Sequence, residues 1–230
     1  MTINEERHAR TIKLIGEDGL ARLRASKVII IGVGGVGSYA AEACVRAGIG
    51  HLTFMDGDSA APSNLNRQLV ALTSTLGRNK AKVMAERAAD IDPETEITAI
   101  PRFYRTDDDL DLTSYDWIID AIDDVDAKTA LICRASELGV SIISAMGAAG
   151  KFGTEFKVAD ISKTSVCPLA RVMRRRLRDR GIEHLPVVYS EEKPVPREDV
   201  LGTLSYVPGS AGLTLAGYVI KQIALGGGVE

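Results

Sequence analysis

Residues 28–38 read VIIIGVGGVGS, an apolar run that leads into three glycines, Gly32, Gly34 and Gly37, spaced as G-x-G-x-x-G. A glycine turn between a strand and a helix lets the backbone approach a phosphate closely, and the N-terminus of the helix adds N–H donors and a favourable dipole. Asp56 follows about 20 residues later, where a carboxylate can accept hydrogen bonds from ribose hydroxyl groups. The stretch therefore predicts a nucleotide-binding site, but it does not distinguish NAD from ATP.

Strands and helices alternate on both sides of this turn. The predicted strands are Lys27–Ile31, His51–Asp56, Thr95–Phe103, Asp116–Ala121 and Val140–Ser144, and the predicted helices are Val36–Ala47, Asn79–Ile91 and Ala127–Leu138. A short continuous apolar run such as residues 27–31 is typical of a strand that is buried on both faces of a parallel sheet. The alternation predicts an α/β fold, a doubly wound, Rossmann-like and mostly parallel sheet with right-handed crossovers.

The character of the sequence changes after residue 150. We predict an extended strand at Thr154–Ile161, an arginine-rich helix from Pro168, a loop that carries Pro and Glu, and an apolar helix at Ser210–Leu225. This last helix could pack internally or on a partner, and we favour internal packing. At 230 residues the chain suits one domain of ordinary size. We therefore expect a single nucleotide-binding domain over residues 1–230, in which residues 150–230 are an extension.

The composition is that of a globular protein, with 45% hydrophobic and 26% charged residues. No apolar run approaches the roughly 20 residues that cross a bilayer, and the charged N-terminus resembles no signal peptide. The three cysteines are scattered and odd in number, which favours a reducing cytoplasm over a disulfide framework. A net charge of −3 argues against a general nucleic-acid binder, although arginines gather between Arg171 and Arg180. We expect a cytoplasmic protein without membrane contact.

Charged residues that follow the predicted strands favour ATP over NAD. A triphosphate that is attacked at its α-phosphorus needs cations to take up developing charge, and Arg67 and Lys80 could provide them, with Asn64 as a neutral donor. Asp58 and Asp123 could hold Mg²⁺ through a carboxylate and water. Taken alone, Asn64 could cap a turn, Lys80 could be a solvated helix residue, and Asp123 could cap the following helix. Together they fall at the carboxyl ends of successive strands, where ligands of such sheets bind.

The segments GVGGVGS, DGD, SNLNRQ, the following lysine and DAIDD together resemble the E1-like adenylating enzymes of the ThiF/MoeB/HesA group, over about residues 7–144. The resemblance implies that ATP is bound by Gly32, Gly34, Gly35, Gly37, Asp56, Asp58, Asn64, Arg67, Gln68 and Lys80. It also implies that Asp123 holds Mg²⁺ and acts in catalysis with Arg67 and Lys80. In such homodimers an arginine reaches the phosphates in the neighbouring subunit, and Arg10 is the candidate here. The alternative is that Arg10 is a solvated residue of a first helix.

Beyond residue 144 the segments MGAAGKFG, CPLARVMRRRLRDRG and SYVPGSAGL resemble one branch of that group. Its members use ATP to dehydrate and cyclise N6-threonylcarbamoyladenosine (t6A) in tRNA. This branch implies a tRNA that carries t6A as the substrate, and a cysteine desulfurase or sulfur-acceptor protein as a candidate partner. The chain departs from the branch pattern at Cys167, where we expect an aspartate, and this departure leaves any role of that carboxylate in doubt.

The arginine-rich helix fits a tRNA substrate. Helical spacing places Leu169, Val172, Met173 and Leu177 on one face and Arg171, Arg174, Arg175 and Arg178 largely on the other. The arginine face could contact the phosphates of a tRNA stem. The alternative is a solvated face whose arginines pair with Asp179, Glu183 or Glu191.

Three other functions stay open at the level of sequence. The chain could activate a ubiquitin-like sulfur carrier, but members with that role commonly have a zinc site made of two C-x-x-C pairs, and three cysteines cannot form a four-cysteine site. A nicotinamide oxidoreductase is favoured only by the glycine turn. A non-catalytic scaffold would bind a desulfurase without hydrolysing nucleotide.

Overall fold

A computed structural model describes residues 6–195 and 202–227 of the chain. Its strands form one sheet in the order β3-β2-β1-β4-β5-β7-β6, in which only the β6–β7 pair is antiparallel. In chain order they are β1 (Lys27–Ile31), β2 (His51–Met55), β3 (Glu96–Ile100), β4 (Trp117–Asp120), β5 (Ser141–Ala145), β6 (Lys157–Asp160) and β7 (Pro186–Tyr189). The predicted doubly wound, mostly parallel α/β sheet is confirmed.

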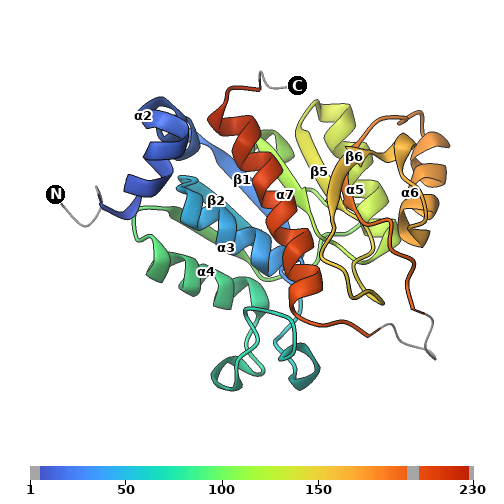
Figure 1. Ribbon diagram of the computed structural model, residues 1–230, viewed down its shortest axis with the longest axis horizontal. Coiled ribbons are helices and arrows are strands. Elements are labelled where there is room, and N and C mark those ends of the chain that lie inside the picture. Colours follow the sequence, from blue (N-terminus) through green and yellow to red (C-terminus); the bar gives the residue numbers. More distant parts are fainter. Residues whose placement is uncertain (1–5, 196–201, 228–230) are drawn as a thin grey trace.

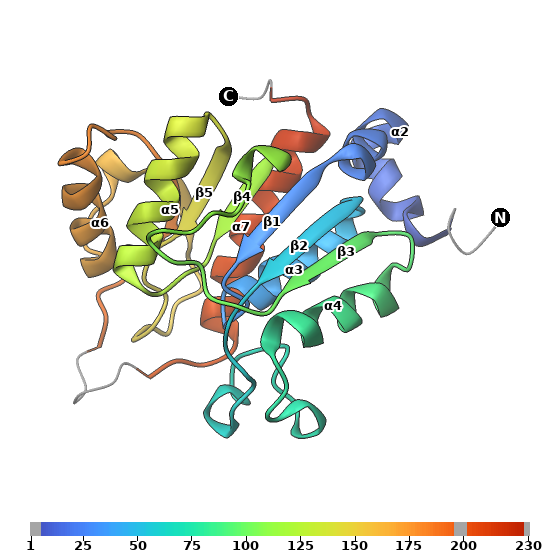
Figure 2. The same cartoon turned by 180° about the vertical axis from the view of Figure 1, so that it is seen from behind.

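Helices cover both faces of this sheet (Figures 1 and 2). One face carries α2 (Ala9–Ala25), α3 (Gly37–Ala47), α4 (Lys80–Ile91) and α7 (Tyr206–Ala224). The other face carries α5 (Val125–Leu138) and α6 (Pro168–Arg178). Short 3₁₀ turns lie in the connections at Pro62–Asn64, Thr73–Thr75, Leu112–Ser114 and Ile161–Lys163. None of the helices within residues 6–195 and 202–227 has both the length and the apolar character that a membrane span requires.

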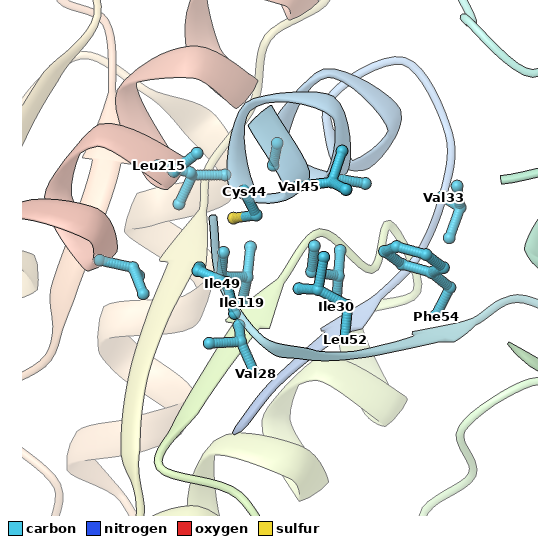
Figure 3. Close-up of a cluster of buried hydrophobic side chains, with 14 of the residues drawn as sticks. Val28, Ile30, Val33, Cys44, Val45, Ile49, Leu52, Phe54, Ile119 and Leu215 are labelled. Carbon is cyan, nitrogen blue, oxygen red and sulfur yellow. The ribbon is translucent and has the colours of Figure 1, made fainter. Parts of the chain in front are cut away.

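The central strand β1 supplies side chains to both hydrophobic clusters. Val28 and Ile30 pack under α3, next to Cys44 and Leu215, as Figure 3 shows. The alternate residues of β1 face α5 and α6, in a second cluster of buried side chains. Successive side chains of a strand point to opposite faces, so a strand with helices on both sides must be apolar throughout. The run VIII at residues 28–31 meets that requirement.

The extension after residue 150 is built into the same sheet. Strand β7 pairs in parallel with β5, so that Ser144 lies opposite Val187. The sequence analysis did not predict β7, because its four residues precede a segment that reads as a loop. Helix α7 packs on α3, where an added Cβ at Gly212 would lie 2.2 Å from the carbonyl oxygen of Val36. The prediction that the last helix packs internally is confirmed, with Leu215 fully buried and Leu213 exposed.

Candidate active site

A cavity of about 950 Å³ opens at the carboxyl ends of the parallel strands. Ligands of doubly wound sheets bind at this edge, because the strand-to-helix loops converge there. The cavity is lined by Gly32, Gly34, Gly35, Asp56, Asp58, Arg67, Gln68, Lys80 and Asp123, all of which the sequence analysis selected. Gly37, Asn64 and Arg10 were also selected, but they are not among its lining residues. Most of the predicted nucleotide-binding residues therefore meet in one place.

The glycines of the β1–α3 turn divide into two kinds. Gly32 has a φ of +90° and an added Cβ there would lie 2.5 Å from the carbonyl oxygen of Ala121, while a Cβ at Gly37 would lie 1.8 Å from the carbonyl oxygen of Gly32. These two glycines permit close packing of the turn. Gly34 and Gly35 line the cavity, and the nearest atom to an added Cβ at Gly34 is the Gln68 amide nitrogen at 3.7 Å. The middle of the turn thus leaves its backbone open to a ligand.

Asp56 ties this turn to the end of β2. One carboxylate oxygen accepts the N–H of Val33 at 2.7 Å, and the other accepts the N–H of Asp58 at 2.8 Å. Burial raises the pKa of the Asp56 carboxyl group, although the two N–H donors and the nearby charge of Lys80 oppose that shift. Each oxygen keeps a second lone pair that can accept a hydrogen bond from a ribose hydroxyl.

Lys80 and Arg67 bring positive charge to the same cavity. Lys80 begins α4 and is buried, and its Nζ lies 2.9 Å from a carboxylate oxygen of Asp58. Arg67 donates from Nη1 to the carbonyl oxygen of Ser63 at 2.8 Å, so its guanidinium is held by the loop that carries it. Asp58 is therefore positioned as the counter-charge of Lys80.

Gln68 is a buried amide beside the glycine turn. Its side-chain oxygen has no hydrogen-bond partner among the described residues. A buried polar atom without a partner is costly unless a ligand or water satisfies it. Its place next to Gly34 fits a cavity that receives a polar molecule such as a nucleotide.

Asp123 and Asp124 are neighbours with different roles. The Asp124 carboxylate accepts the N–H of Ala127 at 2.8 Å and caps α5, which is the alternative role that the sequence suggests for Asp123. Asp123 is exposed and lines the cavity. The described residues hold no cluster of three or more metal-binding side chains, but Mg²⁺ on a nucleotide usually needs only one or two carboxylates besides phosphate and water. Asp123 fits that requirement.

Asn64 and Arg10 are not among the residues that line the cavity. The Asn64 side-chain oxygen accepts the N–H of Ala61 at 3.2 Å, which is the turn-capping role considered above. Arg10 is exposed on α2. Arg7, just before α2, lies 2.8 Å from the carboxylate of Asp92, just after α4. Asp92 follows α4 and precedes β3, so that contact lies where the parallel strands begin, at the end of the sheet opposite the cavity. Figure 1 shows the start of α2 beside the end of α4.

The buried face of helix α6 differs from the predicted one at Val172 and Ala170. Val172, placed on the apolar face, is 44% exposed, and Ala170 is buried with Met173 and Leu177 instead. Arg174 donates to the carbonyl oxygen of Thr164 at 2.7 Å and to its hydroxyl oxygen at 2.6 Å, so it holds the preceding turn. The other selected arginines, Arg171, Arg175 and Arg178, are exposed.

Sequence reasoning missed two groups at the site. Lys128 on α5 and Asp120 at the end of β4 form a fully buried ion pair at 2.6 Å, and Asp120 also accepts the N–H of Ile122 in the turn that leads to Asp123. Lys151 lines the cavity after β5. A lysine close to glycines, just after a strand that ends at the cavity edge, was the available signal for Lys151.

Comparisons with known proteins agree with this geometry. The model of the ThiF family matches residues 6–228. The tRNA threonylcarbamoyladenosine dehydratase of Bacillus subtilis is 39% identical over 231 residues, which cover 91% of each chain. The enzyme of the same name from Escherichia coli is 39% identical over 77% of this chain and 68% of its own. The structure of E. coli tRNA N6-threonylcarbamoyladenosine dehydratase in complex with ATP superposes with a TM-score of 0.89 at 33% identity, over 96% of this chain and 95% of that one.

Proposed function

The chain belongs to the ThiF family, and we propose that it is an ATP-dependent tRNA threonylcarbamoyladenosine dehydratase. The observation that carries the proposal is that the chain matches dehydratases in sequence and in fold along nearly its whole length. Its cavity also brings together a glycine turn, carboxylates and cationic side chains. The activation of a sulfur carrier is not favoured. The B. subtilis dehydratase matches 91% of this chain, whereas the molybdopterin-synthase adenylyltransferase of E. coli matches only 60% of it.

The reaction needs no nucleophile from the enzyme. A carboxylate oxygen of the threonylcarbamoyl group attacks the α-phosphorus of ATP, and the bond from that phosphorus to the bridging oxygen breaks and releases pyrophosphate. The carbamoyl group of the same substituent then attacks the activated acyl carbon, AMP leaves with the carboxylate oxygen, and one proton is lost. Both partners of the second step sit on one side chain, so the effective molarity can reach about 10⁵ M or more.

We propose these roles for the residues of the cavity. The backbone N–H groups around Gly34 and Gly35 bind phosphate, and Asp56 binds the ribose. The buried side-chain oxygen of Gln68 accepts a hydrogen bond from the nucleotide. Arg67 and Lys80 bind the triphosphate and take up the charge that develops at the α-phosphorus. When ATP arrives, Lys80 exchanges its contact with Asp58 for phosphate. Gly32 and Gly37 shape the turn. Asn64 caps the turn at Ala61 and so holds the loop that carries Arg67 and Gln68.

Asp123 is the residue that would hold Mg²⁺. The ion, when bound with ATP, neutralises phosphate charge and favours departure of pyrophosphate. The buried pair of Lys128 and Asp120 fixes the turn that carries Asp123. Asp123 therefore presents its carboxylate to the cavity while Asp124 caps the helix.

We also propose an assembly for this enzyme. The enzyme is a cytoplasmic homodimer of single-domain subunits, in which residues 150–230 form the extension specific to this branch. Arg10 of one subunit reaches the phosphates bound by the other, because within its own subunit it lies at the opposite edge of the sheet. Arg171, Arg175 and Arg178 bind tRNA phosphates, and Arg174 supports their helix. A sulfur-transfer partner would act outside this reaction, since the chemistry moves no sulfur.

The direct test is conversion of the modified nucleoside. Purified protein is incubated with ATP, Mg²⁺ and tRNA that carries t6A, and the nucleosides are identified by mass spectrometry. We expect loss of one water from t6A and formation of equal amounts of AMP, with no conversion when ATP is left out. Unchanged t6A and intact ATP, from protein shown to be folded, would refute the proposed function.

A further inference from the structure

Lys151 is a buried lysine in the same cavity, and the nucleotide-binding roles proposed above do not involve it. It follows β5 and is only 3% exposed. Its Nζ donates to the carbonyl oxygen of Gly147 at 3.0 Å and to that of Ser190 at 3.4 Å. It also lies 5.6 Å from the centre of the Phe156 ring. The ammonium group is thus held in one place against a wall of the cavity.

Among the described residues, no carboxylate lies within ion-pair distance of this ammonium group. Glu192 is near, but its two oxygens accept the N–H groups of Phe152 at 2.9 Å and Gly153 at 2.7 Å. The neighbouring Cys167 is a free cysteine. Burial lowers the pKa of Lys151, against the opposing influence of Cys167 and Glu192. Because lysine is rarely buried without a paired charge, the site is suited to an anion that comes from outside the chain.

The surroundings of Lys151 separate it from the predicted phosphate site. The sheet order places β5 two strands away from β1, and strands lie about 4.8 Å apart, so the ends of β1 and β5 are about 10 Å apart. On the wall beside Lys151, an added Cβ at Gly147 would lie 3.5 Å from the sulfur of Cys167. Helix α6 begins there, and the Cys167 side chain does not cap it, so the positive end of the helix dipole adds to the charge of Lys151.

We propose that Lys151 binds the carboxylate of the threonylcarbamoyl group and directs it toward the α-phosphorus of ATP. This inference rests on the proposed function. The ammonium group donates a charge-assisted hydrogen bond to one carboxylate oxygen and leaves the other oxygen to attack. The gain is in position, since fixing a nucleophile near its target removes much of the entropic barrier. Lys151 forms no covalent bond in this role.

The test compares two tRNA ligands that differ only in the carboxylate. One carries t6A and the other carries t6A whose carboxyl group is blocked as a methyl amide. Binding to the full-length protein is measured with an ATP analogue that has a methylene bridge between the α- and β-phosphorus atoms, so that no adenylate forms. We expect wild-type protein to prefer the free carboxylate by about tenfold or more. Lys151→Gln keeps donors for the two carbonyl groups, and Lys151→Met removes them. Both should lose the preference.

Three results decide the matter. A wild-type protein that binds both tRNAs equally would overturn the inference, even if both variants failed to fold. A variant that binds the ATP analogue normally and keeps the preference would also overturn it. A variant that binds the analogue more weakly but keeps the preference would place Lys151 on phosphate instead. Conversion of t6A by wild-type protein is measured in parallel, so that failure of the proposed function is seen separately.

A matched control removes a lysine charge elsewhere. Lys27 is exposed at the start of β1, at the edge of the sheet opposite the cavity. Lys27→Met should keep the full preference for the carboxylate. A loss of preference in this variant would show that net charge, and not the position of Lys151, governs the discrimination.

Discussion

At the scale of single residues, the site depends on which of two similar side chains the local backbone engages. Asp123 and Asp124 are adjacent, yet only Asp124 accepts the N–H of Ala127 at the start of α5. Lys80 and Lys82 both lie in the first turn of α4, and only Lys80 is buried beside Asp58. Helix geometry points such neighbours in different directions, so a shift of one or two residues separates a ligand-binding group from a structural or solvated one.

Asp123→Asn should lower turnover by about 100-fold or more, because the amide has lost the charge that the proposed Mg²⁺ site requires. Thermal stability should stay unchanged, since no described residue bonds the Asp123 carboxylate. Turnover of t6A-bearing tRNA and the dependence of the rate on Mg²⁺ concentration are the measurements. Asp109→Asn removes a fully exposed carboxylate outside the cavity and should leave the rate unchanged. Equal rates for Asp123→Asn and wild type would remove Asp123 from the mechanism.

Asp92 should make folding sensitive to acid. Burial alone raises its pKa, but the N–H of Glu94 and the guanidinium groups of Arg24 and Arg7 outweigh burial, and the net pKa is lowered. Its stabilising contribution is therefore complete above the unfolded pKa of about 3.9 and is lost as the pH falls through the lower folded value. Asp92→Asn should lower the free energy of unfolding by about 3 kcal/mol at neutral pH.

The free energy of unfolding, measured with denaturant between about pH 2 and pH 7, checks this prediction, because the range spans the unfolded pKa of about 3.9. His8 lies 3.4 Å from the same carboxylate and titrates in an overlapping range. The proteins with and without Asp92→Asn are therefore compared in a background that carries His8→Gln. The difference between the two proteins should shrink as the pH falls below about 4. A difference that stays constant over the whole range would show that the charge of Asp92 does not stabilise the fold.

At the scale of elements, the nucleotide turn depends on a helix from the far end of the chain. Helix α7 packs on α3, and an added Cβ at Gly212 would lie only 2.2 Å from the carbonyl oxygen of Val36. Pro208, from the first turn of the same helix, lies over Gly35 and lines the cavity. The extension therefore supports the turn at which the proposed phosphate site begins.

Gly212→Ala should lower the free energy of unfolding by about 2 kcal/mol and weaken ATP binding, because its Cβ would force α7 away from α3. Gly217, on the same helix, has no atom within 4 Å of an added Cβ. Gly217→Ala should stabilise the protein by about 0.5–1 kcal/mol through helix propensity and leave ATP affinity unchanged. Denaturant unfolding and calorimetric ATP titration measure both effects. Equal behaviour of the two variants would mean that the helices can separate freely.

The exposed arginines of helix α6 should bind tRNA phosphates. Replacing Arg171, Arg175 and Arg178 together by Ala should weaken tRNA binding and reduce the slope of log K against log salt by about 0.9 for each phosphate that the variant no longer neutralises. The conversion of a free t6A nucleoside should change little. Arg46→Ala on α3, on the opposite face of the sheet, is the control and should keep the wild-type slope. An unaltered slope in the triple variant would identify α6 as a solvated face.

At the scale of the whole molecule, one subunit holds the nucleotide cavity and its proposed arginine finger at opposite edges. The cavity lies at the carboxyl ends of the strands, and α2 is anchored to Asp92 at the other end of α4. Arg10 can therefore act on ATP only in a neighbouring subunit. The single chain contains an incomplete site if this proposal holds.

Mixing two inactive variants tests that arrangement. Arg10→Ala and Asp123→Ala should each abolish turnover, and a heterodimer of the two has one site with an intact Asp123 and an intact Arg10 from its partner. Random reassociation should restore about a quarter of wild-type activity. The control mixes Arg67→Ala with Asp123→Ala, whose defects lie in the same cavity, so the heterodimer has no complete site and activity should stay absent. Restoration in the control, or none in the first mixture, would contradict the dimer.

The sequence alone predicted β1 to β5 of the parallel sheet and most of the residues proposed to bind the nucleotide, which line the cavity. Apolar runs, glycine spacing and carboxylates at strand ends are local patterns, and the ends of parallel strands meet at one edge in any doubly wound sheet. It also indicated the family through motifs whose order and spacing are read directly along residues 28–123.

Features that depend on contacts between distant segments could be seen only in the folded chain. Strand β7 forms because β5 offers it an edge, Arg174 is held by the turn at Thr164, and Asp124 takes the cap that frees Asp123 for the cavity. The proposed role of Lys151 depends on its surroundings, because none of the described residues places a carboxylate within ion-pair distance of its ammonium group. Burial and charge pairing are properties of three-dimensional neighbourhoods, and these neighbourhoods join residues that lie far apart along the chain.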